Sequence, residues 1–353
     1  MSRSNTHANT SLPFDCWPCR DRDQWLRACE PRIRLERGGR LGHLARVSRQ
    51  DLERRYGYFL SFVQRSEPLS DHLTPAAYVT PARVQAYFEH LQRCVSSVTL
   101  AGNIRKLHSA AKALDPSQDF GWLAELALDL EFIAEPKDKR ARIRESHVLV
   151  EAGLSLFQGA LLTRPSIVNA RMARDGLMIA LLAHCPIRLK NFANLTITRS
   201  FRREGEHWTI ILAAKDTKSR RADERPVPTD LTPYIESYLE RFRPLLLGSL
   251  LEEERGTDPG ALWISRQTGR RMSYSGVERA IIARTQEALG IAVSPHLFRC
   301  AAASTLAVHA GQDPHLASAL LQHTDARITE MHYNRASSVH AVQAYARLIQ
   351  DLR

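Results

Sequence analysis

Ser294-Pro295-His296-Leu297-Phe298-Arg299 is the stretch of this 353-residue chain that says most about its fold. It stands directly before an apolar helical pattern, which predicts a helix over residues 297–310. His296 and Arg299 are three residues apart at the start of that helix, so both side chains lie on one side of it. A single His/Arg pair of this kind is usually incidental, and its meaning depends on the segments that accompany it.

Three other segments carry side chains suited to phosphate chemistry. Arg188 follows an apolar helical stretch, His323 ends another, and Tyr333 comes ten residues after His323. Transfer of a phosphodiester without a metal needs cationic donors for the non-bridging oxygens and a nucleophile with a proton acceptor. It also needs a proton donor for the leaving oxygen. Arginine suits the first task because its planar fork matches two phosphate oxygens and keeps its charge.

Apolar periodicity divides the chain into two mainly helical parts. Residues 1–47 are rich in arginine and are expected to form a partly ordered arm. Residues 48–134 predict a compact four-helix domain, whose first helix is expected to be capped by Ser48 and whose second opens at Thr80-Pro81. Residues 135–145 combine proline with charge and lack apolar periodicity, which is typical of a linker, here a basic one.

Residues 146–353 predict a second, α-rich domain with one small sheet. A strand over 208–212, a polar turn and residues 225–228 indicate a β-hairpin with a basic tip. The fold class expected is therefore mainly α with a small antiparallel β-sheet. The helices expected in this domain cover residues 148–158, 168–183, 190–195, 231–246, 274–289, 297–310, 314–321 and 337–352.

Composition and charge favour a soluble protein with a polyanionic partner. The formal net charge is +11 and the pI about 9.6, which suits DNA or RNA first and an anionic membrane surface second. No long apolar run predicts a membrane span, and the polar N-terminus lacks a secretory signal, so a cytoplasmic location with reduced cysteines is expected. Cys16 and Cys19 form a C-x-x-C pair, but a zinc site would need two further ligands at matching spacing, so a metal site is not expected.

Taken together and in this order, these segments resemble the tyrosine recombinase (phage integrase) family, whose signature runs Arg, Lys, His-x-x-Arg, His, Tyr. Residues 186–189 look like its first arginine motif, and 214–220 leading to 225–228 are similar to its lysine hairpin. Residues 294–299 and 320–324 match its second box. The resemblance covers roughly residues 48–353. It implies a helical core-binding domain over 48–134 and a catalytic domain over 146–353.

The resemblance implies a role for each residue of the signature. Tyr333 would attack the scissile phosphate, form a 3′-phosphotyrosyl bond and free a 5′-hydroxyl, so that the chain acts as a site-specific DNA recombinase. Arg188 and Arg299 would clamp the non-bridging oxygens, with a further hydrogen bond from His323. His296 would help to accept the tyrosine proton, and Lys215 would protonate the departing oxygen. No metal, nucleotide or other cofactor is then required.

Three departures from the family pattern concern the fine structure of the site. Asn191 stands where the family often has an acidic residue, which bears on positioning more than on activity. His332 occupies the commoner nucleophile position, nine residues after His323, but an imidazole would be an unusual nucleophile here. Lys218 lies on the same hairpin as Lys215, and alignment with the strand end favours Lys215.

The resemblance also implies partners. Double-stranded DNA is the expected substrate, bound by a homotetramer on synapsed sites that is a monomer or weak oligomer when free, with partner recombinases possible. The C-terminal helix over 337–352 could dock on a neighbouring protomer or pack on its own domain. The setting expected is the bacterial cytoplasm, on the nucleoid during action. Residues expected to contact DNA are Arg105, Lys106, Lys137, Lys139, Arg140 and Lys218.

Other classes of function stay open at this point. A type IB topoisomerase uses a similar set of residues, although the helical N-terminal domain and the spacing argue against it. A catalytically inactive DNA-binding accessory protein would be expected to lack the tyrosine or an arginine, and none is lost. A membrane- or RNA-binding protein would leave the ordered set of Arg, His and Tyr unexplained. Among recombinase settings, a mobile element is expected, with integration, transposition and dimer resolution all open.

Overall fold

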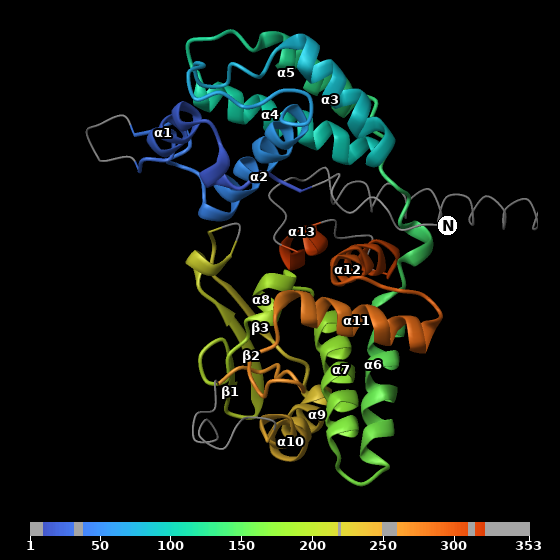
Figure 1. Cartoon of the computed structure of the whole chain (residues 1–353). Helices are drawn as coiled ribbons and strands as arrows, with labels where there is room; N and C mark the ends of the chain where they lie inside the picture. The colour runs from blue at the N-terminus through green and yellow to red at the C-terminus, as the bar shows by residue number, and fades with distance from the viewer. Residues whose placement is uncertain (1–9, 32–37, 218–219, 249–259, 310–314, 322–353) are drawn as a thin grey trace, which may run out of the picture. The chain divides into compact units, whose positions relative to one another are not determined.

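The computed structural model describes residues 10–31, 38–217, 220–248, 260–309 and 315–321, and the chain divides into two compact units, Met1–Asp138 and Lys139–Arg353 (Figure 1). The described residues are mostly helical with one three-stranded antiparallel sheet, which confirms the expected fold class. Within those residues no helix has both the length and the apolar character that a membrane span requires.

The first unit contains the four helices expected over residues 48–134. They are α2 (Arg46–Val63), α3 (Pro81–Cys94), α4 (Ser97–Leu114) and α5 (Gly121–Phe132). α3 opens at Thr80-Pro81 as expected, with Thr80 as its N-cap, whose side chain accepts from the Arg83 N–H. The expected cap at Ser48 is wrong: Ala45 is the N-cap of α2, and the Ser48 N–H donates to the Ala45 oxygen inside the first turn.

The N-terminal segment is part of this unit's core where the structure describes it. A 3₁₀ turn, Phe14–Cys16, leads into α1 (Cys19–Ala28), and Trp17 and Trp25 are both buried. The Trp17 ring packs edge-on against Tyr56, with centroids 4.8 Å apart, and the Tyr56 hydroxyl donates to Asp21 at 2.6 Å. The expectation of an arm over 1–47 is therefore wrong for residues 14–28, because two tryptophans within an otherwise polar stretch bury against α2.

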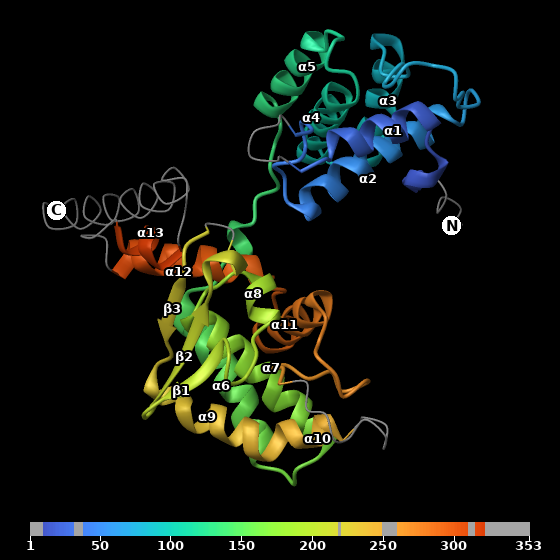
Figure 2. The ribbon, with the colours of Figure 1, turned by 90° about the vertical axis from the view of Figure 1, so that its left-hand side faces the viewer.

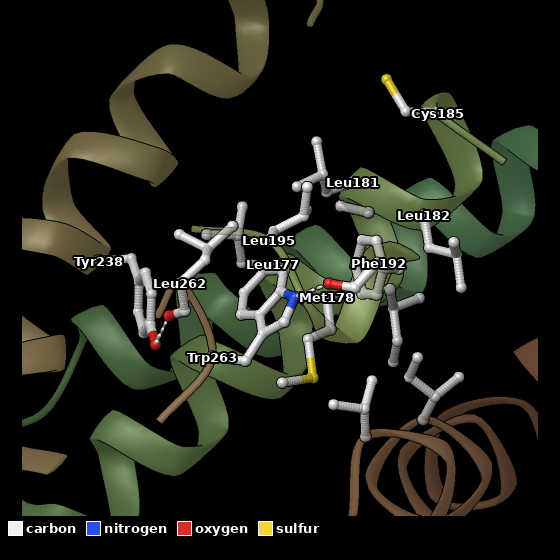
Figure 3. Packing of buried hydrophobic residues seen from close by; sticks show 14 of the residues in the cluster. Leu177, Met178, Leu181, Leu182, Cys185, Phe192, Leu195, Tyr238, Leu262 and Trp263 are labelled. Atoms are coloured by element: carbon white, nitrogen blue, oxygen red, sulfur yellow. Dashed lines mark hydrogen bonds between the residues drawn. The ribbon is translucent and has the colours of Figure 1, made fainter. Parts of the chain in front are cut away.

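The second unit is built around α7 (Ile167–His184), which is buried over most of its length. Figures 1 and 2 show α6 (Ser146–Leu161) beside it, and Gly153 and Gly176 let the two backbones approach closely. Figure 3 shows the core next to α7, where the Trp263 indole N–H donates to the Phe192 oxygen at 2.9 Å and the Tyr238 hydroxyl donates to the Leu262 oxygen at 2.9 Å. Burial of these large rings gives the unit a core of its own.

The remaining helices of this unit follow the expected ranges, with one interruption. They are α8 (Leu189–Ala193), α9 (Thr232–Ser237), α10 (Arg243–Leu247), α11 (Tyr274–Leu289), α12 (Pro295–His309) and α13 (His315–Leu321). The single helix expected over 231–246 is divided by a π-helical turn, Tyr238–Phe242. Pro244 lies just beyond that turn and has no N–H to give to the preceding turn, which explains the change of hydrogen bonding.

The sheet has the order β1-β2-β3, with β1 at Phe201–Glu204, β2 at His207–Leu212 and β3 at Asp223–Pro226. β2 and β3 pair antiparallel with Thr209 opposite Pro226, which confirms the expected hairpin. β1 was not expected, because its four residues include three exposed polar ones and carry little strand pattern. In Figure 2 the sheet lies on one side of α7, and α8, α12 and α13 gather at the end where α7 stops.

Candidate active site

Arg299 joins three segments of the second unit. It lies on the buried side of the first turn of α12, where only 8% of it is exposed. Its Nη1 donates to the Pro186 oxygen at 2.6 Å, and its Nη2 donates to the oxygen of Leu321, the last residue of α13. The segments that precede Arg188 and His323 therefore both contact Arg299. Leu321 is the last residue that the structure describes before His323.

Arg188 begins α8, and the turn before it sets its position. The Ile187 N–H donates to the Cys185 oxygen at 2.7 Å, and the Asn191 and Phe192 N–H groups both donate to the Arg188 oxygen. The Arg188 side chain is half-buried, and its charge acts on Arg299. Asn191 enters this site through its backbone, as the residue that closes the first turn of α8.

Positive charge accumulates here, and Asp223 is the one carboxylate among the described residues that acts on Arg299. Burial first, and then Arg188 and Arg225, lower the pKa of the Arg299 guanidinium to about 10. Arg299 still carries its proton at neutral pH, and its charge is repelled by those of Arg188 and Arg225. Such perturbed, like-charged groups are typical of sites that receive an anion, and a phosphate between them would relieve the repulsion.

His296 lies on the exposed side of α12, one turn before Arg299. Partial desolvation of the imidazole by its neighbours, and then the charges of Lys139 and Arg299, lower its pKa below the ordinary value. The ring is therefore neutral at physiological pH and able to accept a proton. Lys139 belongs to the linker, whose continuation is fastened to α12, because the Ser146 N–H donates to Thr305 at 3.0 Å and His309 lies 3.0 Å from Glu145.

Lys215 is exposed on a short 3₁₀ turn, Ala214–Asp216, directly after β2. The loop that carries it is ordered by Thr217, whose buried hydroxyl accepts from the Arg221 N–H at 3.1 Å and lies 2.7 Å from the Arg221 oxygen. Within the described part of the chain Lys215 has no ion-pair partner, so its ammonium group is available to a substrate.

Sequence reasoning missed Arg225 and Asp223. Arg225 is only 8% exposed on β3, and its guanidinium bonds both oxygens of Asp223 at 2.9–3.1 Å. Its Nη2 also donates to the Leu320 oxygen at 2.7 Å, one residue before the carbonyl that Arg299 holds. Strand alternation could have found Arg225, because it lies on the same inward face of the strand as the buried Val227. Its charge instead favours the interpretation as part of a basic hairpin tip.

The other expected site residues fall into three groups. His323, Tyr333 and Lys218 lie outside the described residues, as does the helix expected over 337–352. Lys106 forms an ion pair with Asp51, and Arg105 pairs with Glu131 at 2.9 Å, so a DNA phosphate would have to compete with a carboxylate for each. Lys137 and Lys139 are exposed, and the Arg140 backbone starts a 3₁₀ turn, Arg140–Arg142.

The described residues hold no cluster of three His, Cys, Asp or Glu side chains that could bind a metal ion. Cys16 and Cys19 are both free thiols. The Cys19 N–H starts α1 and donates to Asp71 at 2.6 Å, which gives this residue a structural place in the first unit.

Comparison with known proteins decides the family. The model described as "Phage integrase family" matches residues 160–340, just over half of the chain. The chain belongs to the phage integrase family. All of the positions expected to be catalytic, from Arg188 to Tyr333, lie inside that match.

Relatives of this phage integrase family member include "Tyrosine recombinase XerD" of Pseudomonas aeruginosa (strain PAO1), which is 27% identical over 174 residues. The aligned part covers 49% of this chain and 53% of XerD, so the chain spans about half the length of the curated relative it matches. The crystal structure of XerH site-specific recombinase bound to difH substrate, a pre-cleavage complex, aligns with a TM-score of 0.54 at 13% identity. That alignment covers 94% of this chain and 99% of XerH, and it shows a shared fold.

Proposed function

We propose that this phage integrase family member is a site-specific DNA recombinase that cleaves and rejoins DNA strands through a 3′-phosphotyrosyl bond to Tyr333. The observation that carries the proposal is the position of Arg299 on α12. It binds the oxygen of Leu321, two residues before His323 in the sequence, and lies close enough to Arg188 for the two charges to interact. Positive groups held this close favour a phosphate in which negative charge develops.

The chemical step follows from the residues present. The Tyr333 oxygen attacks phosphorus, the bond from phosphorus to the 5′-oxygen breaks, and the tyrosine proton passes to a base. His296 suits the base, because its lowered pKa keeps the ring neutral at physiological pH. Lys215 gives a proton to the departing 5′-oxygen. The phosphotyrosyl bond conserves the energy of the broken bond, so a 5′-hydroxyl of a partner strand reverses the step.

Arg188, Arg299 and His323 would stabilise the transition state by donating to the non-bridging oxygens. Removing one such donor in a water-excluded site typically lowers a rate by roughly 10²–10³. Asn191 replaces an acid that many relatives carry at this position, and its backbone bond to Arg188 still orients the start of α8.

The partner we propose is double-stranded DNA, in keeping with a net charge of +11 and with XerH, which was solved on its difH substrate. The first unit would serve as the core-binding domain and the second as the catalytic domain, with the basic linker along the phosphate backbone. A homotetramer on synapsed sites, in a bacterial cytoplasm, would carry out exchange for a mobile element.

A nicked suicide substrate tests the proposal directly, because loss of the short 5′ fragment traps the covalent intermediate. Wild-type protein is expected to form an adduct that survives denaturing electrophoresis, and Tyr333→Phe is expected to form none while still binding the same DNA. Tyr274→Phe is the matched control, since it removes the same hydroxyl from an exposed tyrosine on α11.

Two outcomes would contradict the proposal. Adduct from Tyr333→Phe at the wild-type yield would exclude Tyr333 as the nucleophile. DNA binding without any adduct from the wild-type protein would instead favour an inactive accessory protein.

A further inference from the structure

The ion pair of Arg225 and Asp223 is buried beside the candidate active site, and the proposed mechanism leaves it unused. The Arg225 Nε lies 3.0–3.1 Å from both Asp223 oxygens, and the side chains are 9% and 12% exposed. Taking two charges out of water carries a large desolvation penalty, so such a pair is a weak source of stability. Its presence here therefore points to a role in holding something in place.

What the pair holds is the end of α13. The Arg225 Nη2 donates to the Leu320 oxygen at 2.7 Å, and the Arg299 Nη2 donates to the next carbonyl oxygen, that of Leu321. The last carbonyls of a helix have no partner within the helix and carry partial negative charge. Two guanidiniums, one from β3 and one from α12, thus take two successive carbonyls of the same helix end.

The hydrogen bonds of Arg225 go to Asp223 and to this helix end. Its Nη1 is fully buried, with no acceptor among the described residues, and only 9% of the side chain is exposed. Arg299 is equally buried, but its charge acts directly on His296, the proposed base.

We propose that Arg225, oriented by Asp223, is a positioning residue of the strand-cleavage site that acts through His323. The inference rests on the proposed function. His323 follows Leu321 by two residues, so covalent geometry keeps its Cα within about 8 Å of the Leu321 Cα. Fixing the two carbonyls at the end of α13 therefore fixes the point from which the chain continues to His323. A misplacement of about 1 Å in such a group lowers a rate by roughly 10².

Single-turnover cleavage of the nicked suicide substrate at saturating DNA tests this role. Arg225→Gln is expected to lower the rate constant by about 10²-fold, with the final yield of adduct and the Kd for DNA unchanged. Arg225→Lys keeps the charge without the planar fork and is expected to fall between this variant and wild type. Asp223→Asn, which frees the guanidinium from its orienting carboxylate, is expected to lower the rate in the same direction.

Arg203→Gln provides the matched control. Arg203 lies on β1 of the same sheet and pairs with Glu236 at 2.7 Å, but its side chain is 50% exposed. Its loss is expected to leave the rate unchanged. A merely structural role for Arg225 would lower the yield of adduct, because fewer molecules would be folded, and would leave the rate constant of the remainder as in wild type; that result overturns the inference.

A double variant shows whether Arg225 acts through His323. In a His323→Ala background, adding Arg225→Gln is expected to change the rate by no more than about 2-fold, since coupled residues are not additive. If Arg225→Gln lowers the rate constant in that background by the same factor as in the wild-type background, the inference is overturned. A wild-type rate constant for Arg225→Gln alone overturns it as well. A wild-type protein that forms no adduct would instead overturn the proposed function, and this inference with it.

Discussion

Arg299 has two tasks that a substitution would remove together. It brings a cation to the site, and its Nη atoms satisfy the carbonyl oxygens of Pro186 and Leu321. Leaving a buried carbonyl without its donor costs about 1–3 kcal/mol. Loss of activity in an Arg299 variant would therefore combine chemistry with a displaced helix end. Lys139 and His296 offer a cleaner separation.

Lys139→Gln is expected to shift the acid limb of the cleavage rate to higher pH. His296 must be neutral to accept the tyrosine proton, so the rate rises as pH increases through its pKa and then levels off. Burial, Lys139 and Arg299 hold that pKa low, and loss of the Lys139 charge raises it. The measurement is the single-turnover rate against pH at saturating DNA.

Lys137→Gln is the control for this experiment, because it removes an exposed lysine of the same linker that is not among the charges lowering the His296 pKa. Its acid limb should coincide with that of wild type. Identical limbs for wild type and Lys139→Gln would show that His296 is not the base or that Lys139 does not act on it.

At the residue scale, sequence pattern proposes a set of site residues but does not tell which of them are buried. His296 is exposed and Arg299 is buried, although the two lie only three residues apart on α12. Arg225 was read as part of a basic hairpin tip because its partners, Asp223 and the Leu320 oxygen, are set by strand register and by a helix 95 residues away. Long-range contacts of this kind leave no local trace in the sequence.

At the element scale, the close approach of α6 and α7 sets the frame on which α8 and α12 are placed. A Cβ on Gly176 would lie 2.6 Å from the Gly153 oxygen and 2.9 Å from the Phe157 nitrogen, both backbone atoms. Since backbone cannot move aside as a side chain can, Gly176→Ala is expected to lower the free energy of unfolding by about 1–3 kcal/mol. Chemical denaturation of the purified protein measures this change.

Gly159→Ala tests the same substitution on α6 where there is room for it. The added Cβ would meet only the Met172 Cε, at 3.3 Å, which is the far end of a flexible side chain. Alanine also favours helix over glycine by about 1 kcal/mol. The account expects this variant to be at least as stable as wild type, and equal losses for both variants would contradict the packing argument.

Elements with strong periodicity were predictable, and those governed by tertiary packing were not. The expected helix over 274–289 matches α11 to the residue, because Ser273 caps it and Gly290 adopts a positive φ of 67° beyond its end. α1 was missed, since its polar composition conceals the buried Trp25. β1 is too short to show alternation, and it forms because it pairs with β2.

At the scale of the whole molecule, excess positive charge should control affinity for DNA. If each unit contacts several phosphates, affinity falls by roughly 10³–10⁵ between 50 and 200 mM salt. Lys137→Gln is expected to reduce the slope of log K against log salt by about 0.9, because Lys137 is exposed. Lys106→Gln is expected to change it less, since Lys106 already pairs with Asp51.

Fluorescence anisotropy with a labelled duplex measures both slopes. Equal reductions for the two variants would mean that Lys106 exchanges its carboxylate for a phosphate on binding. An affinity that does not depend on salt would contradict DNA binding through phosphate contacts.

The central claim is that Tyr333 becomes joined to DNA. Digestion of the wild-type adduct with nuclease and trypsin should yield the peptide of residues 328–335, which contains both His332 and Tyr333. Fragmentation by mass spectrometry then locates the remaining nucleotide. We expect a 3′-phosphate linkage on Tyr333, and a nucleotide on His332 or on any other peptide would contradict the proposed mechanism.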